Sequence, residues 1–135
     1  SNYYTPDDFD RMVNATSVLP AVLQNETHPY HQSADMKEYI AQYGTVLESW
    51  FPLGGRGNTQ ALFNDPVISA IASAHGKTPA QVILRWHLQD GHIAIPGSHN
   101  ETHIQENFDI FDFELTPDEM TQIAALDKNE RLGDW

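Results

Sequence analysis

Histidine is the most versatile metal-ligating and acid–base residue in this sequence, which contains seven of them. His99 and His103 are four residues apart, and Glu106 lies one helical turn further on. On one helical face these side chains would offer Zn²⁺ two imidazoles and a carboxylate. The pattern is not the His-Glu-x-x-His motif of zinc enzymes, however, because Asn100 follows His99. We therefore expect surface or capping histidines, assign His28 in a predicted turn to structure, and keep a metal-binding domain as the minor alternative.

Trp50 and the glycines that follow it are the second candidate for chemistry. Residues 54–57 read Gly-Gly-Arg-Gly, which lacks the Gly-x-x-x-x-Gly-Lys-Ser/Thr pattern of a phosphate-binding P-loop. Taken by themselves, these residues favour a flexible loop with a solvated Arg56 and a Trp50 side chain in the core. The alternative is a loop whose main-chain amides approach a phosphate, with Trp50 as a flat platform for a bound ring.

The charge balance and composition narrow the class of protein. Nineteen acidic residues against seven basic ones give a net charge of -12, which repels nucleic acid and anionic membrane surfaces. The absence of cysteine excludes a disulfide scaffold, a thiolate zinc site and a cysteine nucleophile. No apolar run approaches the ~20 residues of a membrane helix, and the polar, acidic start does not resemble a signal peptide. We therefore expect a cytoplasmic protein.

Turn residues and apolar periodicity predict alternating strands and helices. Three apolar, β-branched segments predict strands over residues 21–26, 45–50 and 92–95. Ser33 is predicted to cap a helix, and Thr78 with Gln81 to form a capping box. The predicted helices cover residues 5–16, 36–43, 64–75, 78–88, 101–108 and 116–126, with a loop over 52–57 and an irregular tail over 128–135.

Alternation of strands with helical connections predicts a parallel sheet and therefore the α/β class. Three strands are few, because even a modest sheet usually has ~4 to 6 and a TIM barrel has eight in ~250 residues. The sequence has no internal repeat and no domain linker. We therefore expect the 135 residues to form one part of a larger parallel architecture.

Five stretches of the sequence carry a combined signature. They are Gln24–Tyr30, Leu47–Gly54, Gly76–Trp86, Ile95–Ser98 and Glu106–Leu115. In this order and at this spacing they resemble the aldo-keto reductase family, over essentially the whole chain. Small microbial reductases of the diketogluconate-reductase type are the most similar in style, since they also have Ser-Trp at the end of the second predicted strand.

The family fold is a TIM barrel, so the resemblance implies a partial (β/α)8 barrel. Residues 1–135 would be its C-terminal half, without a further domain boundary. The three predicted strands would be its sixth, seventh and eighth, and Ser1-Asn2 would lie at the end of the fifth. The family's catalytic Asp, Tyr, Lys and His match no residue of this chain, so the resemblance implies cofactor binding here and no catalytic residue.

The resemblance also assigns roles at the nicotinamide end of an NADP or NAD site. Ser1, Asn2 and Gln24 match the residues that bind the carboxamide, for which paired donors and acceptors are required. Trp50 matches the aromatic side chain that stacks on the nicotinamide ring. The remaining matches belong to the segment that wraps the pyrophosphate, namely Phe51, Leu53 and Gly54.

Four residues match positions at the adenosine end of the cofactor, namely Ser98, His103, Glu106 and Asn107. The family often has Lys at the position of Gly97 and Arg at the position of His103, and both cations pair with the 2′-phosphate of NADP. A bidentate arginine contact is stronger than a contact from a neutral imidazole. The two departures therefore make NAD, or use of both cofactors, an alternative to NADP.

Two main hypotheses follow. The first is that the chain is part of an NAD(P)H-dependent aldo-keto reductase that converts a small aldehyde or ketone to an alcohol. The second is a non-catalytic remnant or fragment that self-associates through exposed barrel edges, because a partial barrel leaves parallel strand edges and apolar surface uncovered.

Overall fold

A parallel sheet of three strands lies at the centre of the molecule. The computed structural model describes residues 5–55 and 57–132. The strands are β1 (Val22–Glu26), β2 (Val46–Trp50) and β3 (Ile93–Ala94), in the spatial order β1-β2-β3. Gln24 lies beside Glu48 and Glu48 beside Ile93, so these three residues share one face of the sheet. All three predicted strands are confirmed, each slightly shorter than expected.

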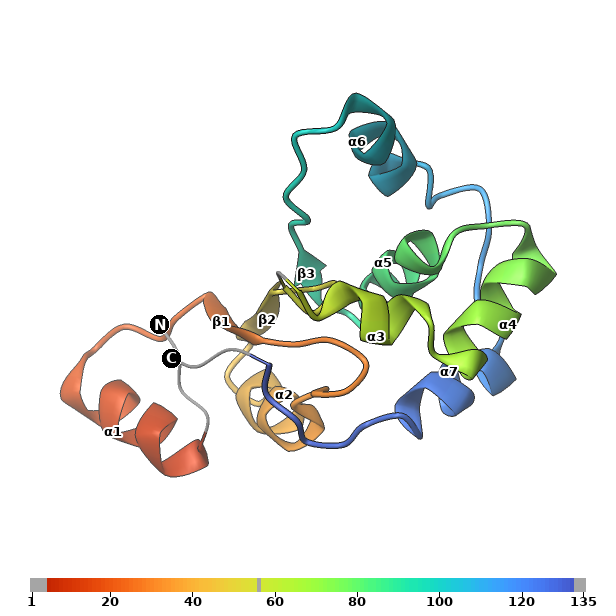
Figure 1. Ribbon diagram of the computed structural model, residues 1–135. Coiled ribbons are helices and arrows are strands. Elements are labelled where there is room, and N and C mark those ends of the chain that lie inside the picture. The colour runs from red at the N-terminus through yellow and green to blue at the C-terminus, as the bar shows by residue number, and fades with distance from the viewer. Residues whose placement is uncertain (1–4, 56, 133–135) are drawn as a thin grey trace.

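Helices connect the strands in the order expected of parallel β/α units (Figure 1). They are α1 (Pro6–Ala15), α2 (Ala34–Ala41), α3 (Thr59–Phe63), α4 (Pro66–His75), α5 (Pro79–Gln89), α6 (Glu101–Phe108) and α7 (Pro117–Ala124). Figure 1 shows α1 and α6 at opposite ends of the molecule, with the sheet between them. No helix within the described ranges is long and apolar enough to cross a bilayer.

Local sequence signals explain most helix boundaries. Thr78 and Gln81 form the predicted capping box at the start of α5, and Gly76 ends α4 with a φ of 63°. Ser33 occupies the predicted N-cap position of α2, but with a φ of 52° it makes no side-chain capping bond. The short helix α3 was not predicted, because five residues are too few for a helical period to emerge. Asn58, which precedes it, also makes no side-chain capping bond.

Two apolar clusters hold the helices in place. Leu23 and Leu47 project from one face of the sheet into a cluster with Phe9 of α1 and Ile40 of α2. A larger cluster joins α3, α4, α5 and α7 around Trp86, which is 1% exposed. The core position predicted for Trp86 is therefore confirmed.

The opposite face of the sheet is left exposed by residues 5–55 and 57–132. Val22, Val46 and Ile93 lie on it and are 43%, 40% and 38% exposed. Apolar side chains in the middle of a sheet are normally buried on both faces in parallel α/β proteins. The exposed face therefore fits a sheet that forms part of a larger barrel.

Candidate functional site

The loops that follow β2 and β3 meet in a cleft of about 690 Å³. Both loops leave the carboxyl ends of their strands, which is where parallel α/β folds bind ligands. Three predicted site residues, Phe51, Leu53 and Ser98, line this cleft. Its remaining lining residues are Pro52, Gly55, Thr59, Ile95, Pro96, Gly97 and His99.

The loop after β2 is tightly bent and depends on its glycines. Phe51 has a φ of 59°, and the amide of Gly54 donates to the carbonyl oxygen of Phe51 at 2.8 Å. Gly54 and Gly55 have φ values of 87° and 75°, which other residues rarely adopt. A Cβ on Gly55 would lie 2.6 Å from the Phe51 ring, and one on Gly54 would lie 2.9 Å from Leu62. This close-packed glycine loop has the form required to bring main-chain amides near a phosphate group.

Two of the predicted nicotinamide-end residues are described: Gln24 lies in the middle of β1 and Trp50 at the carboxyl end of β2. Trp50 is half-buried, and its ring centre is 4.4 Å from that of Phe51. The exposed Gln24 donates from Nε2 to Oε1 of Glu48 at 2.7 Å, which orients its amide on the uncovered face of the sheet. Ser1 and Asn2 lie outside the described residues.

The predicted adenosine-end residues are spread over several faces of the region after β3. Ser98 lies in the cleft, where its hydroxyl accepts from the amide of Asn100 at 3.1 Å. His103 is exposed on α6. Glu106 lines a separate open depression, and Asn107 lines an apolar pocket with Phe108. Within the described structure, His103, Glu106 and Asn107 therefore lie near one another along α6. They do not line the cleft that contains Ser98.

Four histidines are buried, which corrects the expectation of surface or capping histidines. His28, His31, His87 and His92 are each at most 6% exposed. Burial lowers the pKa of His87 to about 3, and it also lowers the pKa of His31. The burial of His87 could have been predicted from the sequence. His87 follows Ile83 by four residues and therefore lies on the apolar face of α5.

His28 has the structural role expected of it. Burial lowers its pKa, even though the neighbouring Glu26 carboxylate opposes the shift. Its Nε2 atom lies 2.9 Å from Oε1 of Glu26, and its Nδ1 atom accepts from the amide of Tyr30 at 3.3 Å. In the part of the chain that the structure describes, no group of three or more His, Cys, Asp or Glu side chains is arranged to hold a metal ion. This geometry gives no support to the metal-binding alternative.

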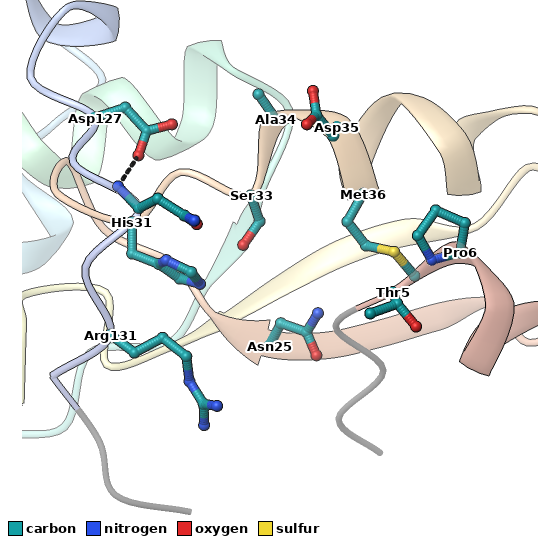
Figure 2. A pocket seen from close by; sticks show the side chains of 11 residues that line it. Thr5, Pro6, Asn25, His31, Ser33, Ala34, Asp35, Met36, Asp127 and Arg131 are labelled. Atoms are coloured by element: carbon teal, nitrogen blue, oxygen red, sulfur yellow. Dashed lines mark hydrogen bonds between the residues drawn. The ribbon is translucent and has the colours of Figure 1, made fainter.

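A second, more polar pocket of about 600 Å³ lies between β1, the starts of α1 and α2, and the C-terminal segment. Figure 2 shows the side chains of Asn25, His31 and Arg131 around this space. Asp127 holds the C-terminal segment here, because its Oδ1 accepts from the amide of Gln32 at 3.3 Å. The sequence did not single out this pocket, since it is assembled by residues about a hundred positions apart. None of the predicted cofactor residues that the structure describes lines it.

Known proteins resemble this chain over nearly all of its length. Residues 1–128 match the model of the aldo/keto reductase family. An aldo-keto reductase of Mycolicibacterium smegmatis is 44% identical over 130 residues, which cover 96% of this chain and 46% of that protein. The methylglyoxal reductase DkgA of Escherichia coli is 42% identical over 125 residues, which cover 91% of this chain and 44% of that protein. The chain thus spans about half the length of the curated relatives that it matches.

A solved structure adds a cofactor to the comparison. A point mutant of the protein Gox0644, crystallised in complex with NADPH, superposes with a TM-score of 0.83 at 41% sequence identity. The similarity covers 91% of this chain and 44% of that one. The fold around the cleft is therefore that of a protein known to bind a nicotinamide cofactor.

Proposed function

Because the chain belongs to the aldo/keto reductase family, we propose that it forms the cofactor-binding, C-terminal part of an NAD(P)H-dependent carbonyl reductase. The cleft between the loops after β2 and β3 is the observation that carries this proposal. The bound cofactor would supply hydride from its C4 atom to a small aldehyde or ketone. The proton donor would come from the catalytic tetrad of the family, which we expect to lie outside these 135 residues.

The residues of this chain would bind and orient the cofactor. Ser1, Asn2 and Gln24 would hold the carboxamide, and the ring of Trp50 would support one face of the nicotinamide. Stacking on a rigid aromatic side chain fixes which face of the nicotinamide is presented to the substrate. The bent loop at Phe51, Leu53 and Gly54 would wrap the pyrophosphate with its main-chain amides. The adenosine end would be held by Ser98, His103, Glu106 and Asn107.

The 2′-phosphate end is where the choice between NADP and NAD would be made. Gly97 has no side chain to offer, and His103 is an exposed imidazole in place of a guanidinium. An ion pair with a doubly charged phosphate is therefore weaker here than in relatives with Lys and Arg. We propose that the chain accepts NAD as well as NADP, with at most a small preference for NADP.

Isothermal titration of the chain with NADPH and NADH tests both statements. Trp50→Ala should weaken NADPH binding about tenfold, because the stacking contact is lost. Phe111→Ala is the matched control, since Phe111 is an aromatic residue that is 71% exposed and lies outside the cleft. Equal loss in the two variants, or no binding by the unaltered chain, would refute cofactor binding in this cleft.

The second candidate function is a non-catalytic fragment that associates through its uncovered sheet face. The exposure of Val22, Val46 and Ile93 favours it, because such a face tends to pair with another surface. Sedimentation equilibrium distinguishes the candidates: the fragment hypothesis predicts dimers that Val46→Lys abolishes. A monomer at all concentrations would eliminate it.

A further inference from the structure

A chain of polar side chains leads from the cleft loop through the interior to α2. Nε2 of His87 lies 3.0 Å from the carbonyl oxygen of Pro52, and its Nδ1 lies 3.1 Å from Nδ1 of His92. Nε2 of His92 is 3.1 Å from Oδ2 of Asp90, which is ion-pair distance, although the ring N–H does not point straight at the oxygen. Nζ of Lys37 is 3.0 Å from the same oxygen.

We call His87, His92, Asp90 and Lys37 the histidine relay. Both of its imidazoles are shielded from water. His87 is 0% exposed and His92 is 5% exposed. Their rings pack against Trp86, with ring centres 4.6 Å and 5.3 Å away. Without water, each ring nitrogen must be matched by a protein donor or acceptor of the right kind.

The direction of each hydrogen bond follows from counting protons. A carbonyl oxygen only accepts, so Nε2 of His87 must carry the proton that it donates to Pro52. Burial keeps His87 neutral, so its Nδ1 carries no proton. This nitrogen therefore accepts a hydrogen bond from the Nδ1–H of His92. The second nitrogen of His92 faces the carboxylate of Asp90, which also only accepts.

The anchored carbonyl determines the orientation of the next amide. In a planar trans peptide the C=O and the following N–H point in opposite directions. The carbonyl of Pro52 points inward to the buried His87, so the amide of Leu53 points away from the interior. Pro52 and Leu53 both line the cleft, and this outward side is the cleft side.

We infer that His87 is a positioning residue, which holds the Pro52–Leu53 peptide so that the Leu53 amide faces a phosphate group in the cleft. The inference rests on the proposed function for its ligand, and on the contacts above for its geometry. His92, Asp90 and Lys37 set the tautomer of His87. Asp90 is well suited to this role: burial pushes its pKa up, but the neighbouring His92 and Lys37 side chains outweigh burial and leave the pKa below its usual value.

Imidazole nitrogen NMR tests the relay without any cofactor. The ¹⁵N-labelled chain should show His87 as the neutral tautomer protonated on Nε2 near neutral pH, and His92 with a proton on Nδ1. Asp90→Asn should change the His92 nitrogen signals, because it replaces the carboxylate that lies 3.1 Å from Nε2. A His87 protonated on Nδ1, or a His92 signal that Asp90→Asn leaves unchanged, would overturn the relay.

Three substitutions at one position test the positioning role. His87→Gln places an amide N–H near the site of Nε2 and can still reach Pro52, whereas His87→Asn reaches only the site of Nδ1. His87→Leu removes the donor altogether. His75→Gln is the control, because His75 pairs with Glu119 on α7, outside the cleft and the relay.

The readouts are the Leu53 amide resonance and the affinity for NADP⁺. The Gln variant and the control should keep both close to those of the unaltered chain. The Asn and Leu variants should shift the Leu53 resonance and weaken NADP⁺ binding about threefold to tenfold. The positioning role would be refuted if His87→Gln and His87→Asn had the same Leu53 resonance and the same affinity for NADP⁺. If the unaltered chain binds no NADP⁺, the proposed function fails, and the Leu53 resonance still decides whether His87 orients the peptide. If the His87→Leu variant does not fold, comparison of His87→Gln with His87→Asn is sufficient.

Discussion

Substitution of Gly55 by Ala gives the sharpest test of the cleft loop, because Gly57 provides a matched control in the same loop. Both glycines have a positive φ, 75° for Gly55 and 84° for Gly57, so either Ala introduces the left-handed strain of an L-residue, about 1–2 kcal/mol. Only at Gly55 does the new Cβ meet other atoms, since three Phe51 ring atoms lie at 2.6, 2.7 and 2.8 Å. Apart from Gly57 and its two chain neighbours, no atom of the described residues lies within 4 Å of a Cβ built on Gly57.

The clash adds an overpacking cost at Gly55 of about 1–2 kcal/mol. We therefore expect Gly57→Ala to lower the free energy of unfolding by about 1–2 kcal/mol and Gly55→Ala by about 2–4 kcal/mol. Guanidinium titration followed by tryptophan fluorescence measures both values. Because the Phe51 ring that must move packs on Trp50, Gly55→Ala should also weaken NADPH binding while Gly57→Ala changes it little. Equal destabilisation by the two substitutions would show that the loop is not packed as described.

Three further predictions concern pH, a buried hydroxyl and cofactor choice. The pKa of His87 falls from 6.5 to about 3 on burial, so its stabilising contribution is complete above about pH 6.5 and is lost as the pH falls toward 3. Urea titrations between these limits measure how the free energy of unfolding changes with pH, and in His87→Gln this slope should be smaller by up to about 1.4 kcal/mol per pH unit. Tyr30→Phe removes the bond of 2.7 Å from the Tyr30 hydroxyl to Asp65 and should cost about 1–2 kcal/mol of unfolding free energy by the same assay, with an unchanged value contradicting the contact. Introducing both Gly97→Lys and His103→Arg should raise the affinity for NADPH relative to NADH at least about tenfold in calorimetry, and an unchanged ratio would disprove the roles given to these positions.

The elements that sequence predicted well are those specified by neighbouring residues. Thr78 and Gln81 satisfy each other's backbone partners within one turn, so their capping box depends on nothing distant. Gly76 adopts the positive φ that ends α4 for an equally local reason. Parallel strands followed from the alternation of the segments, and the resemblance to a barrel family supplied the larger architecture.

The features that sequence missed depend on contacts between distant segments. His87 was not singled out because its partner Pro52 is 35 residues away and His92 is beyond the end of the helix. The spread of Ser98 and Asn107 over separate pockets could not be deduced from motif spacing, since it depends on how α6 turns away from β3. Ser33 was expected to cap α2 from its residue type alone, yet its backbone conformation prevents the capping bond.

The most direct test of the central claim is to map NADP⁺ binding by backbone amide NMR of the ¹⁵N-labelled chain. The amides that move most should belong to the two cleft loops, residues 51–55 and 95–99. The polar pocket beside His31 and Arg131, shown in Figure 2, should be unaffected. Shifts confined to that pocket, or no saturable shifts in either loop, would contradict a cofactor site in the cleft.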